Sequence, residues 1–364
     1  MRPLLILTLC CLPGLAQANA GVFAGSGQTV KLVGTDRIRM IKEAVRIELE
    51  VRDVVQDTLR GKGYVAKYDC RFQLRNLKSN PVSIQVGFPL NSQFFEPPYG
   101  PEEGRDLVEQ YKFRAGTSRG AKYQTDWRPR DEENKFASII LWNMKFRPGE
   151  TIDLVVEYEI PFSQALSTTG REWNRRPAKE WYSKLAGAFE MSFEYVTETG
   201  KSWFGRIDSA SFRIDAKDLE HDLTRNGIYL GPVGPETRQL ASLFQTLYCD
   251  VSPSGWKERN GVLVWEYANY SPGEPIRVRY FPSSIPSSRA HCKAVVSWAL
   301  GETPSNEDLR DFREIVAAYY GELPQTERVK AFVENQWWFP AARRLGGNQK
   351  EVLGYMDSLV ASTR

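Results

Sequence analysis

An alternating pattern runs through Tyr64-Val65-Ala66-Lys67-Tyr68-Asp69-Cys70-Arg71-Phe72-Gln73-Leu74. The even-numbered side chains are apolar, and charged or amide groups occupy positions 67, 69, 71 and 73. Because successive side chains of a strand point to opposite faces of a sheet, this period of two predicts a strand with one buried face. Strands of this one-sided kind are typical of antiparallel sheets.

The same alternation continues on both sides of this stretch. Val45 to Arg52 alternate in the same way, and Gly61-Lys62-Gly63 is a turn signal between the two strands. Residues 91–135 are polar and rich in Pro and Gly, which predicts loops, with one short hairpin as a further option. Further strands are predicted over 82–88, 138–145, 152–160, 189–195, 203–214, 261–270 and 276–281.

From about residue 300 the apolar period changes to that of helices. Ser305 and Asp308 form a capping-box pattern, and Gly321 suits the position after a helix end. Thr326 and Asn348 are candidate caps of two further helices. The sequence therefore predicts a small unit of three short helices.

These patterns divide the chain into five segments and predict a mainly β fold class. Antiparallel β-sandwich domains are expected, followed by a small C-terminal three-helix unit. The segments are a signal peptide over 1–20, a β-sandwich domain over 21–163, a linker over 164–187, a second β-rich domain over 188–298 and the helical unit over 299–364.

The first twenty residues have the parts of a secretory signal peptide. Arg2 provides the positive charge, residues 4–12 the apolar core, and Ala18-Asn19-Ala20 the cleavage site. The apolar run is shorter than the roughly 20 residues that span a bilayer. We expect an exported chain, periplasmic or extracellular after cleavage at Ala20, without a transmembrane segment. The alternative is a buried N-terminal helix.

Composition narrows the range of partners. The aromatic share of 12% and the charged share of 26% are those of a globular protein. The formal net charge is only +3, and no block of Lys or Arg is present, which argues against binding to nucleic acid or to an anionic membrane.

Three cysteines remain after the predicted cleavage. Cys70 shares the apolar face of its strand, which predicts a buried free thiol. Cys249 and Cys292 flank the last predicted β region and are candidates for a disulfide, which an oxidising compartment permits. Sequence alone does not fix their connectivity.

No catalytic residue or metal site is predicted. Gly116-Thr117-Ser118-Arg119-Gly120 matches the nucleophile-elbow pattern, but its flanks are polar, which predicts a turn. His221 and His291 lie in polar contexts and nothing ties them to Ser118. The chain also has no zinc, calcium or nucleotide motif, so no cofactor is expected.

Adjacent aromatic residues are the candidate ligand-binding feature. Trp337, Trp338 and Phe339 are consecutive, so a helix or turn cannot bury all three. An exposed aromatic ring suits sugar stacking or contact with a protein. The alternative is that these rings pack the helical unit against the sandwich.

Two parts of the chain resemble known proteins. Arg313 to Gly321, followed by Phe332 and by Gln336-Trp337-Trp338-Phe339-Pro340, resembles the YARHG domain over about residues 305–360. Matching positions are Arg313, Ala318, Gly321, Gln336 and Trp338, whereas the Tyr, Arg and His that name the domain fall on Ala317, Tyr319 and Tyr320.

That family is extracellular in bacteria and has no assigned chemistry, so the resemblance implies a location rather than an activity. The N-terminal part loosely resembles secreted bacterial β-sandwich proteins of unknown function. That resemblance is carried by Gly25-Ser26-Gly27-Gln28, Gly87-Phe88-Pro89, Pro148-Gly149-Glu150 and Trp203-Phe204-Gly205-Arg206-Ile207.

Two functional hypotheses follow. The first is a non-enzymatic envelope protein that acts as a binding or adaptor module for an envelope protein or a glycan. The alternative is a carbohydrate- or peptidoglycan-binding or hydrolysing protein that uses exposed Trp and carboxylates. Two facing carboxylates in a cleft would favour the alternative. A structural role in a secretion or surface assembly is a third option.

Overall fold

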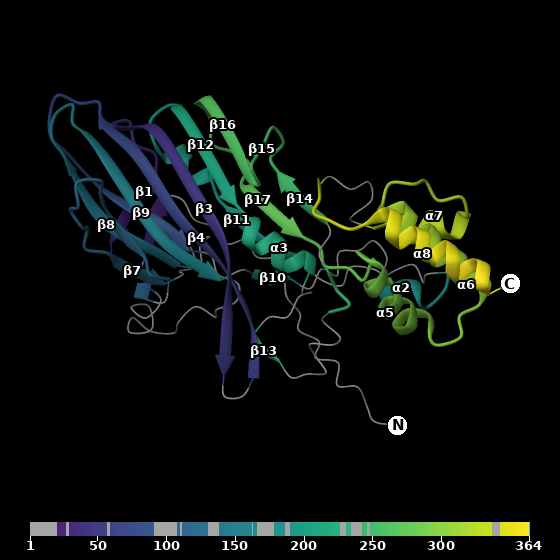
Figure 1. The fold of residues 1–364 in the computed structure, drawn as a ribbon. Coiled ribbons are helices and arrows are strands. Elements are labelled where there is room, and N and C mark those ends of the chain that lie inside the picture. Colours follow the sequence, from purple (N-terminus) through teal and green to yellow (C-terminus); the bar gives the residue numbers. More distant parts are fainter. Residues whose placement is uncertain are drawn as a thin grey trace.

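The computed structural model describes residues 20–363, apart from 27–28, 57–58, 91–107, 110, 130–137, 162, 166–177, 186–189, 226–230, 234–241, 246–247 and 337–342. The described chain forms three β-sheets and a group of helices near the C-terminus (Figure 1). The prediction of a mainly β protein with C-terminal helices is confirmed at this level. The predicted signal peptide lies outside the described residues, except for Ala20.

The largest sheet has eight strands and is built around one long hairpin. The alternating stretch lies in β4 (Leu59–Asn76), which pairs antiparallel with β3 (Ile38–Gln56) along its whole length. Across the sheet the order is β15 (Lys257–Arg259), β16 (Val262–Tyr270), β12 (Ile207–Asp215), β3, β4, β9 (Thr151–Pro161) and β6 (Arg114–Thr117), with β13 (Gly231–Val233) beside the tip of β4.

One pairing in this sheet joins distant parts of the sequence. β12 runs parallel to β3, with Phe212 in register with Val45 and Ile214 with Ile47. Strands assigned from the sequence to the separate segments 21–163 and 188–298 therefore lie side by side in one sheet. The pairing is also parallel, whereas the alternating pattern predicts antiparallel neighbours.

Two five-stranded sheets accompany the large one. The first has the order β2 (Thr29–Leu32), β1 (Gly21–Ser26), β5 (Val82–Leu90), β8 (Ser138–Phe146) and β7 (Asp126–Pro129). The second has the order β10 (Ser163–Ala165), β11 (Glu190–Tyr195), β17 (Ile276–Tyr280), β14 (Tyr248–Ser252) and β18 (Arg343–Arg344).

Aromatic contacts connect the inner face of the large sheet with both smaller sheets. The Tyr158 ring on β9 meets Phe88 of β5 edge-on, with ring centroids 4.8 Å apart. The Tyr68 ring on β4 lies 6.3 Å from that of Tyr195 on β11. Buried side chains of all three sheets form one apolar cluster, so the eight-stranded sheet packs against both smaller sheets through a shared core.

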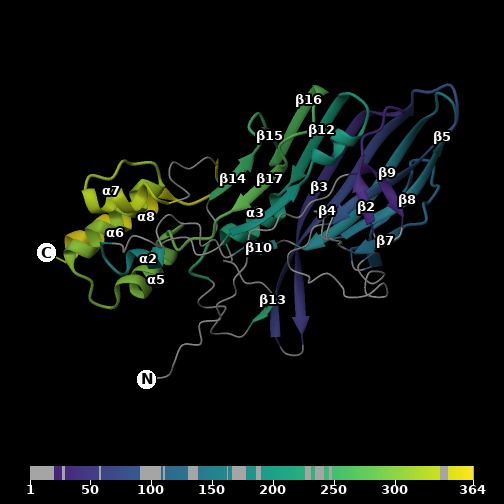
Figure 2. The same ribbon diagram turned by 180° about the vertical axis from the view of Figure 1, so that it is seen from behind.

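The helical unit has its own apolar cluster at one end of the molecule (Figures 1 and 2). It contains α5 (Arg289–Leu300), α6 (Asn306–Tyr319), α7 (Glu327–Val333) and α8 (Gln349–Ser362). The three helices predicted within 299–364 correspond to α6, α7 and α8. The helix α5 was not predicted: it lies almost wholly in the segment 188–298 that was assigned to a β-rich domain, and its first turn is capped by the Ser288 side chain.

The predicted caps have mixed outcomes. The Ser305 hydroxyl accepts from the Asp308 backbone N–H at 3.0 Å, and Asn348 accepts from the Glu351 N–H at 3.1 Å. Gly321 follows α6 with φ of +100°, a conformation that glycine adopts without strain. Thr326 precedes α7 without a side-chain cap bond.

A buried ionic network fixes the segment around α2 (Tyr182–Leu185) to the helical unit. Asp311 on α6, with a side chain only 2% exposed, accepts from the Tyr182 hydroxyl at 2.8 Å. Arg328 of α7 donates two hydrogen bonds to the same carboxylate at 2.8 and 2.9 Å, and Lys179 lies 3.0 Å away. We call this group the Asp311 network.

None of the described helices is long and apolar enough to cross a membrane.

Candidate functional site

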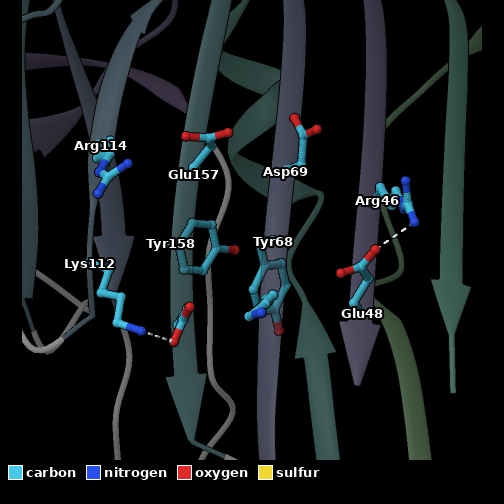
Figure 3. A pocket seen from close by; sticks show the side chains of 10 residues that line it. Arg46, Glu48, Tyr68, Asp69, Lys112, Arg114, Glu157 and Tyr158 are labelled. Atoms are coloured by element: carbon cyan, nitrogen blue, oxygen red, sulfur yellow. Dashed lines mark hydrogen bonds and ion pairs between the residues drawn. The ribbon is translucent and has the colours of Figure 1, made fainter. Parts of the chain in front are cut away.

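A charged pocket lies on the outer face of the eight-stranded sheet (Figure 3). Its volume is about 360 Å³, at the small end of the roughly 300–1,000 Å³ that is usual for ligand sites. It crosses β3, β4, β9 and the start of β6, so each side chain stands on a paired strand or next to one. Its lining consists of Arg46, Glu48, Lys67, Tyr68, Asp69, Lys112, Arg114, Glu157, Tyr158 and Glu159.

The alternation of the strands explains this lining. On β4, Lys67 and Asp69 belong to the polar face, whereas Tyr68 between them is buried. Glu157 and Glu159 occupy the same face of β9 on either side of the buried Tyr158. Side chains of one face on neighbouring strands have Cβ atoms about 4.5–5.5 Å apart, so the register brings these charges together.

The register arranges the charges in two rows with different orders. In one row Glu48 of β3 is opposite Lys67 of β4, which is opposite Glu159 of β9, so neighbouring charges have opposite sign. The other row contains Arg46 on β3, Asp69 on β4, Glu157 on β9 and Arg114 on β6. Its order is positive, negative, negative, positive, and we call it the Arg114 row.

The charges of the alternating row are satisfied by ion pairs with neighbouring side chains. Arg52 bridges Glu50 and Glu159 at 2.9 and 2.8 Å, and Lys112 lies 3.0 Å from Glu159. Lys67 contacts Glu50. The hydrogen bond from Arg52 lowers the pKa of Glu159 below its ordinary value, against the opposing effect of partial burial. These charges are satisfied within the protein.

In the Arg114 row only some of the charged side chains have ion-pair partners. Arg46 pairs with Glu48 at 2.5 Å and Asp69 accepts from Arg71 at 3.0 Å. Within the described part of the chain, Arg114 and Glu157 form no ion pair with each other or with another group, although they are register partners. Figure 3 shows both side chains on adjacent strands without an interaction between them. The row therefore leaves one cation and one anion for a ligand.

Two stacked tyrosines lie beneath the pocket. The rings of Tyr68 and Tyr158 have centroids 4.3 Å apart and planes within 8° of parallel. Both side chains are at most 4% exposed, and burial raises the pKa of both phenols. The phenols face the core, so the pocket offers charged groups rather than a nucleophile.

A buried carboxylate on the inner face was not expected from the sequence. Glu43 is fully buried, and its Oε1 accepts from the Tyr195 hydroxyl at 2.9 Å. A shift of register between Met40 and Lys42 turns Glu43 to the inner face, the one that Val45 also occupies. Bulges of this kind leave no clear trace in a single sequence. Because Glu43 is not exposed, it is no part of the pocket.

The predicted ligand-binding residues are not placed. Trp337, Trp338 and Phe339 lie outside the described residues. The motif positions Ala317, Tyr319 and Tyr320 are described, and their side chains are at most 6% exposed. Those three positions therefore pack in the helical core.

The candidate disulfide between Cys249 and Cys292 is not formed, because both are free buried thiols. Cys249 belongs to the apolar cluster of the sheets and lies 3.3 Å from an Arg343 nitrogen, whereas Cys292 packs against Met356 in the helical cluster. Their separation into two cores explains the correction. Burial raises the pKa of each thiol to about 12. Cys70 is a buried free thiol, as predicted.

The elbow-like motif is a turn, as predicted. Gly116 lies in β6, the exposed Ser118 follows the end of that strand, and Gly120 has a φ of +87°. His291 is buried and its Nε2 lies 3.0 Å from the Leu243 carbonyl oxygen, while burial lowers its pKa. His221 is on α3 (Lys217–Arg225), away from Ser118 in sequence and element. No metal-binding group of His, Cys, Asp or Glu occurs in the part of the chain that is described.

Comparison with known proteins gives no family. No family model and no curated protein matches the chain. The structure is similar to a Legionella pneumophila protein described as a "putative nutrient binding protein", with a TM-score of 0.44 and 14% identity over 96% of this chain and 98% of that chain.

A second similarity is to an M1 zinc metallopeptidase from Deinococcus radiodurans. The TM-score is 0.28 and the identity 10%, over 68% of this chain and 44% of that chain. At these values neither similarity assigns a family or a function to the protein.

Proposed function

We propose that this protein is an exported, non-enzymatic binding module whose ligand site is the charged pocket on the eight-stranded sheet. The observation that carries the proposal is the pair Arg114 and Glu157, which line the pocket and form no ion pair within the described chain. Charged groups that a fold leaves unpaired at a concave surface are the groups that specify a ligand.

The surroundings of this pair support a preformed site. Lys67, Lys112 and Glu159 are held by ion pairs at the pocket rim. The strands β4 and β9, which carry Lys67 and Glu159, are hydrogen-bonded to each other, and their Tyr68 and Tyr158 rings stack beneath the pocket. A site on rigid elements loses little conformational entropy when a ligand binds.

A glycan-hydrolysing role is the second candidate, because Asp69 and Glu157 are register partners on the pocket. Two carboxyl groups about 5 Å apart are the arrangement of retaining glycosidases. Glu157 is exposed to solvent and Asp69 accepts from Arg71, so the pair lacks the apolar surroundings of a general acid. This environment favours binding over hydrolysis.

The export signal and the helical unit give the proposal its setting. Residues 1–20 carry the charge, apolar core and A-x-A site of a signal peptide. The helical unit, with a core of its own and a resemblance to the YARHG domain, is the proposed contact for an envelope protein or glycan. Arg313, a matching position, bonds Asp357 and Glu322 and so supports the unit's structure.

The pocket is tested by a thermal-shift screen of the mature protein with small charged and polar molecules. We expect at least one compound to raise the melting temperature of the natural protein but not of the double variant Arg114→Gln, Glu157→Gln. Mass spectrometry should recover that compound unchanged. Stabilisation that survives in the double variant would place binding elsewhere, and cleaved glycan products would support the enzymatic alternative.

The setting is tested in cells. Fractionation followed by mass measurement should find the protein in the envelope, beginning at Gly21. Crosslinking in intact envelopes should recover a protein or glycan partner, and recovery should fail when residues 300–364 are deleted. A cytoplasmic protein that retains Met1 would contradict export.

A further inference from the structure

We propose that the ligand of the charged pocket is a small zwitterionic amino acid. Its carboxylate would bind Arg114, and its ammonium group would lie between Glu157 and Asp69. This inference rests on the proposed binding function and adds the chemical class of the ligand. It follows from the order of charges in the Arg114 row.

The centre of that row contains two carboxylates directly opposite each other. Like charges in this position destabilise a sheet, whereas opposite charges stabilise it. The neighbouring row avoids the cost by placing Lys67 between Glu48 and Glu159. The Arg114 row itself has no described cation between Asp69 and Glu157; Arg71, two positions along β4, pairs with Asp69 and attracts Glu157 without forming an ion pair with it. An ammonium group between the two carboxylates would relieve this repulsion.

The outer end of the row provides the complementary group. The Arg114 guanidinium is exposed and carries no ion pair in the described chain, so its donors can bind a carboxylate in the bidentate geometry that arginine favours. Because Arg114 and Glu157 are register partners, the two ligand charges must be only a few bonds apart. Amino acids have this spacing.

The charge balance of the pocket excludes ligands of one sign. The pocket as a whole is close to neutral, because four of its side chains are cationic and four are anionic. The cationic ones are Arg46, Lys67, Lys112 and Arg114, and the anionic ones are Glu48, Asp69, Glu157 and Glu159. A simple anion at Arg114 would face Glu157, and a simple cation at Glu157 would face Arg114. A zwitterion satisfies both groups, which is the basis of electrostatic selectivity.

The test is isothermal titration calorimetry of the full mature protein with a series of ligands of increasing chain length. The probes are the ω-amino acids from glycine to 6-aminohexanoate, each with its N-acetyl and its carboxamide derivative. We expect one chain length to bind most tightly. Each derivative of that compound should bind at least tenfold more weakly, because it lacks one of the two charges.

Variants assign the two charges to residues. Arg114→Gln should remove the preference for the free carboxylate over the carboxamide, and Glu157→Gln the preference for the free ammonium over the N-acetyl form. Arg213→Gln is the matched control, because Arg213 is an exposed arginine on β12, in the same sheet but outside the pocket. Thermal unfolding of each variant checks that the fold is retained.

The outcomes separate this inference from the proposed function. Equal binding of the free and blocked compounds would overturn the zwitterion and leave a binding pocket. The zwitterion is also overturned if none of the probes binds but another compound from the thermal-shift screen binds through Arg114 and Glu157. That outcome again leaves a binding pocket. If the binding of no compound depends on Arg114 and Glu157, both the inference and the proposed function are wrong.

Discussion

The Asp311 network and the charged pocket are both groups of ionised side chains, and they differ in how completely they are satisfied. The Asp311 carboxylate is 2% exposed and accepts from Tyr182 and twice from Arg328, with Lys179 close by. In the pocket the charges are more exposed, and Glu157 carries no ion pair within the described chain.

The difference separates structural charges from charges available for binding. A buried charge is tolerated only when its hydrogen-bonding capacity is filled, and removing a partner is then costly. An exposed, unfilled charge costs little because water solvates it, and it remains available to a ligand. The Asp311 network should therefore control stability, and the Arg114 row should control binding.

Asp311→Ala should have the largest effect. It leaves the buried Tyr182 hydroxyl, together with Arg328 and Lys179, without their common acceptor, so we expect a loss of about 3–5 kcal/mol in the free energy of unfolding. Urea denaturation followed by circular dichroism measures it. Glu307→Gln is the control, because Glu307 contacts the same two cations but is 63% exposed. Equal losses in both variants would contradict the comparison.

Acid should also weaken the contact between Asp308 and Lys179, which lies beside the Asp311 network. Burial opposes ionisation of Asp308, but hydrogen bonds from Lys179, Ser305 and the Trp181 ring N–H outweigh it and hold its pKa at about 2, below the ordinary 3.8. A lowered folded-state pKa gives stability that is present above about pH 4 and is lost as the pH falls toward 2.

The expected loss from Asp308 is on the order of 1 kcal/mol, since the group is partly exposed. Urea denaturation at pH values from 5 to 2 measures it. Lys179→Met removes the strongest hydrogen bond to Asp308 and should flatten the dependence in this range. An unchanged slope in that variant would mean that other carboxylates dominate the acid response.

The smallest stability effects should come from the pocket. Arg114→Gln and Glu157→Gln should each change the free energy of unfolding by less than about 0.5 kcal/mol, because neither side chain has an ion pair to lose. Arg52→Met breaks two partly exposed pairs and should cost about 1 kcal/mol, less at high salt. Destabilisation by Glu157→Gln beyond that of Arg52→Met would show that Glu157 is structural.

Local patterns predicted the elements well because their causes are local. Alternation along β4 placed Tyr68 and Cys70 in the core, and Ser305 and Asn348 cap the helices they precede. Each of these features depends on residues a few positions apart, so a single sequence contains the whole signal.

Long-range features could not be predicted in this way. Lys67, Asp69 and Arg46 were assigned correctly to polar faces. The pocket exists only because β9 lies beside β4 and β6 beside β9, which brings in Glu157 and Arg114. Strand neighbours are set by the whole fold, and nothing near residue 157 encodes them. The Cys249–Cys292 pairing failed for the same reason, since closeness along the chain does not tell which core a side chain enters.

The parallel pairing of β3 with β12 also determines the order in which the chain can be completed. β3 ends at Gln56, but its partner begins only at Ile207, so synthesis delivers the two strands far apart in time. Until residue 215 has emerged, β3 lacks this neighbour and exposes a strand edge of the kind that promotes aggregation. A fragment that ends at Ser163 keeps this edge open permanently, so we expect it to aggregate more readily than the full chain.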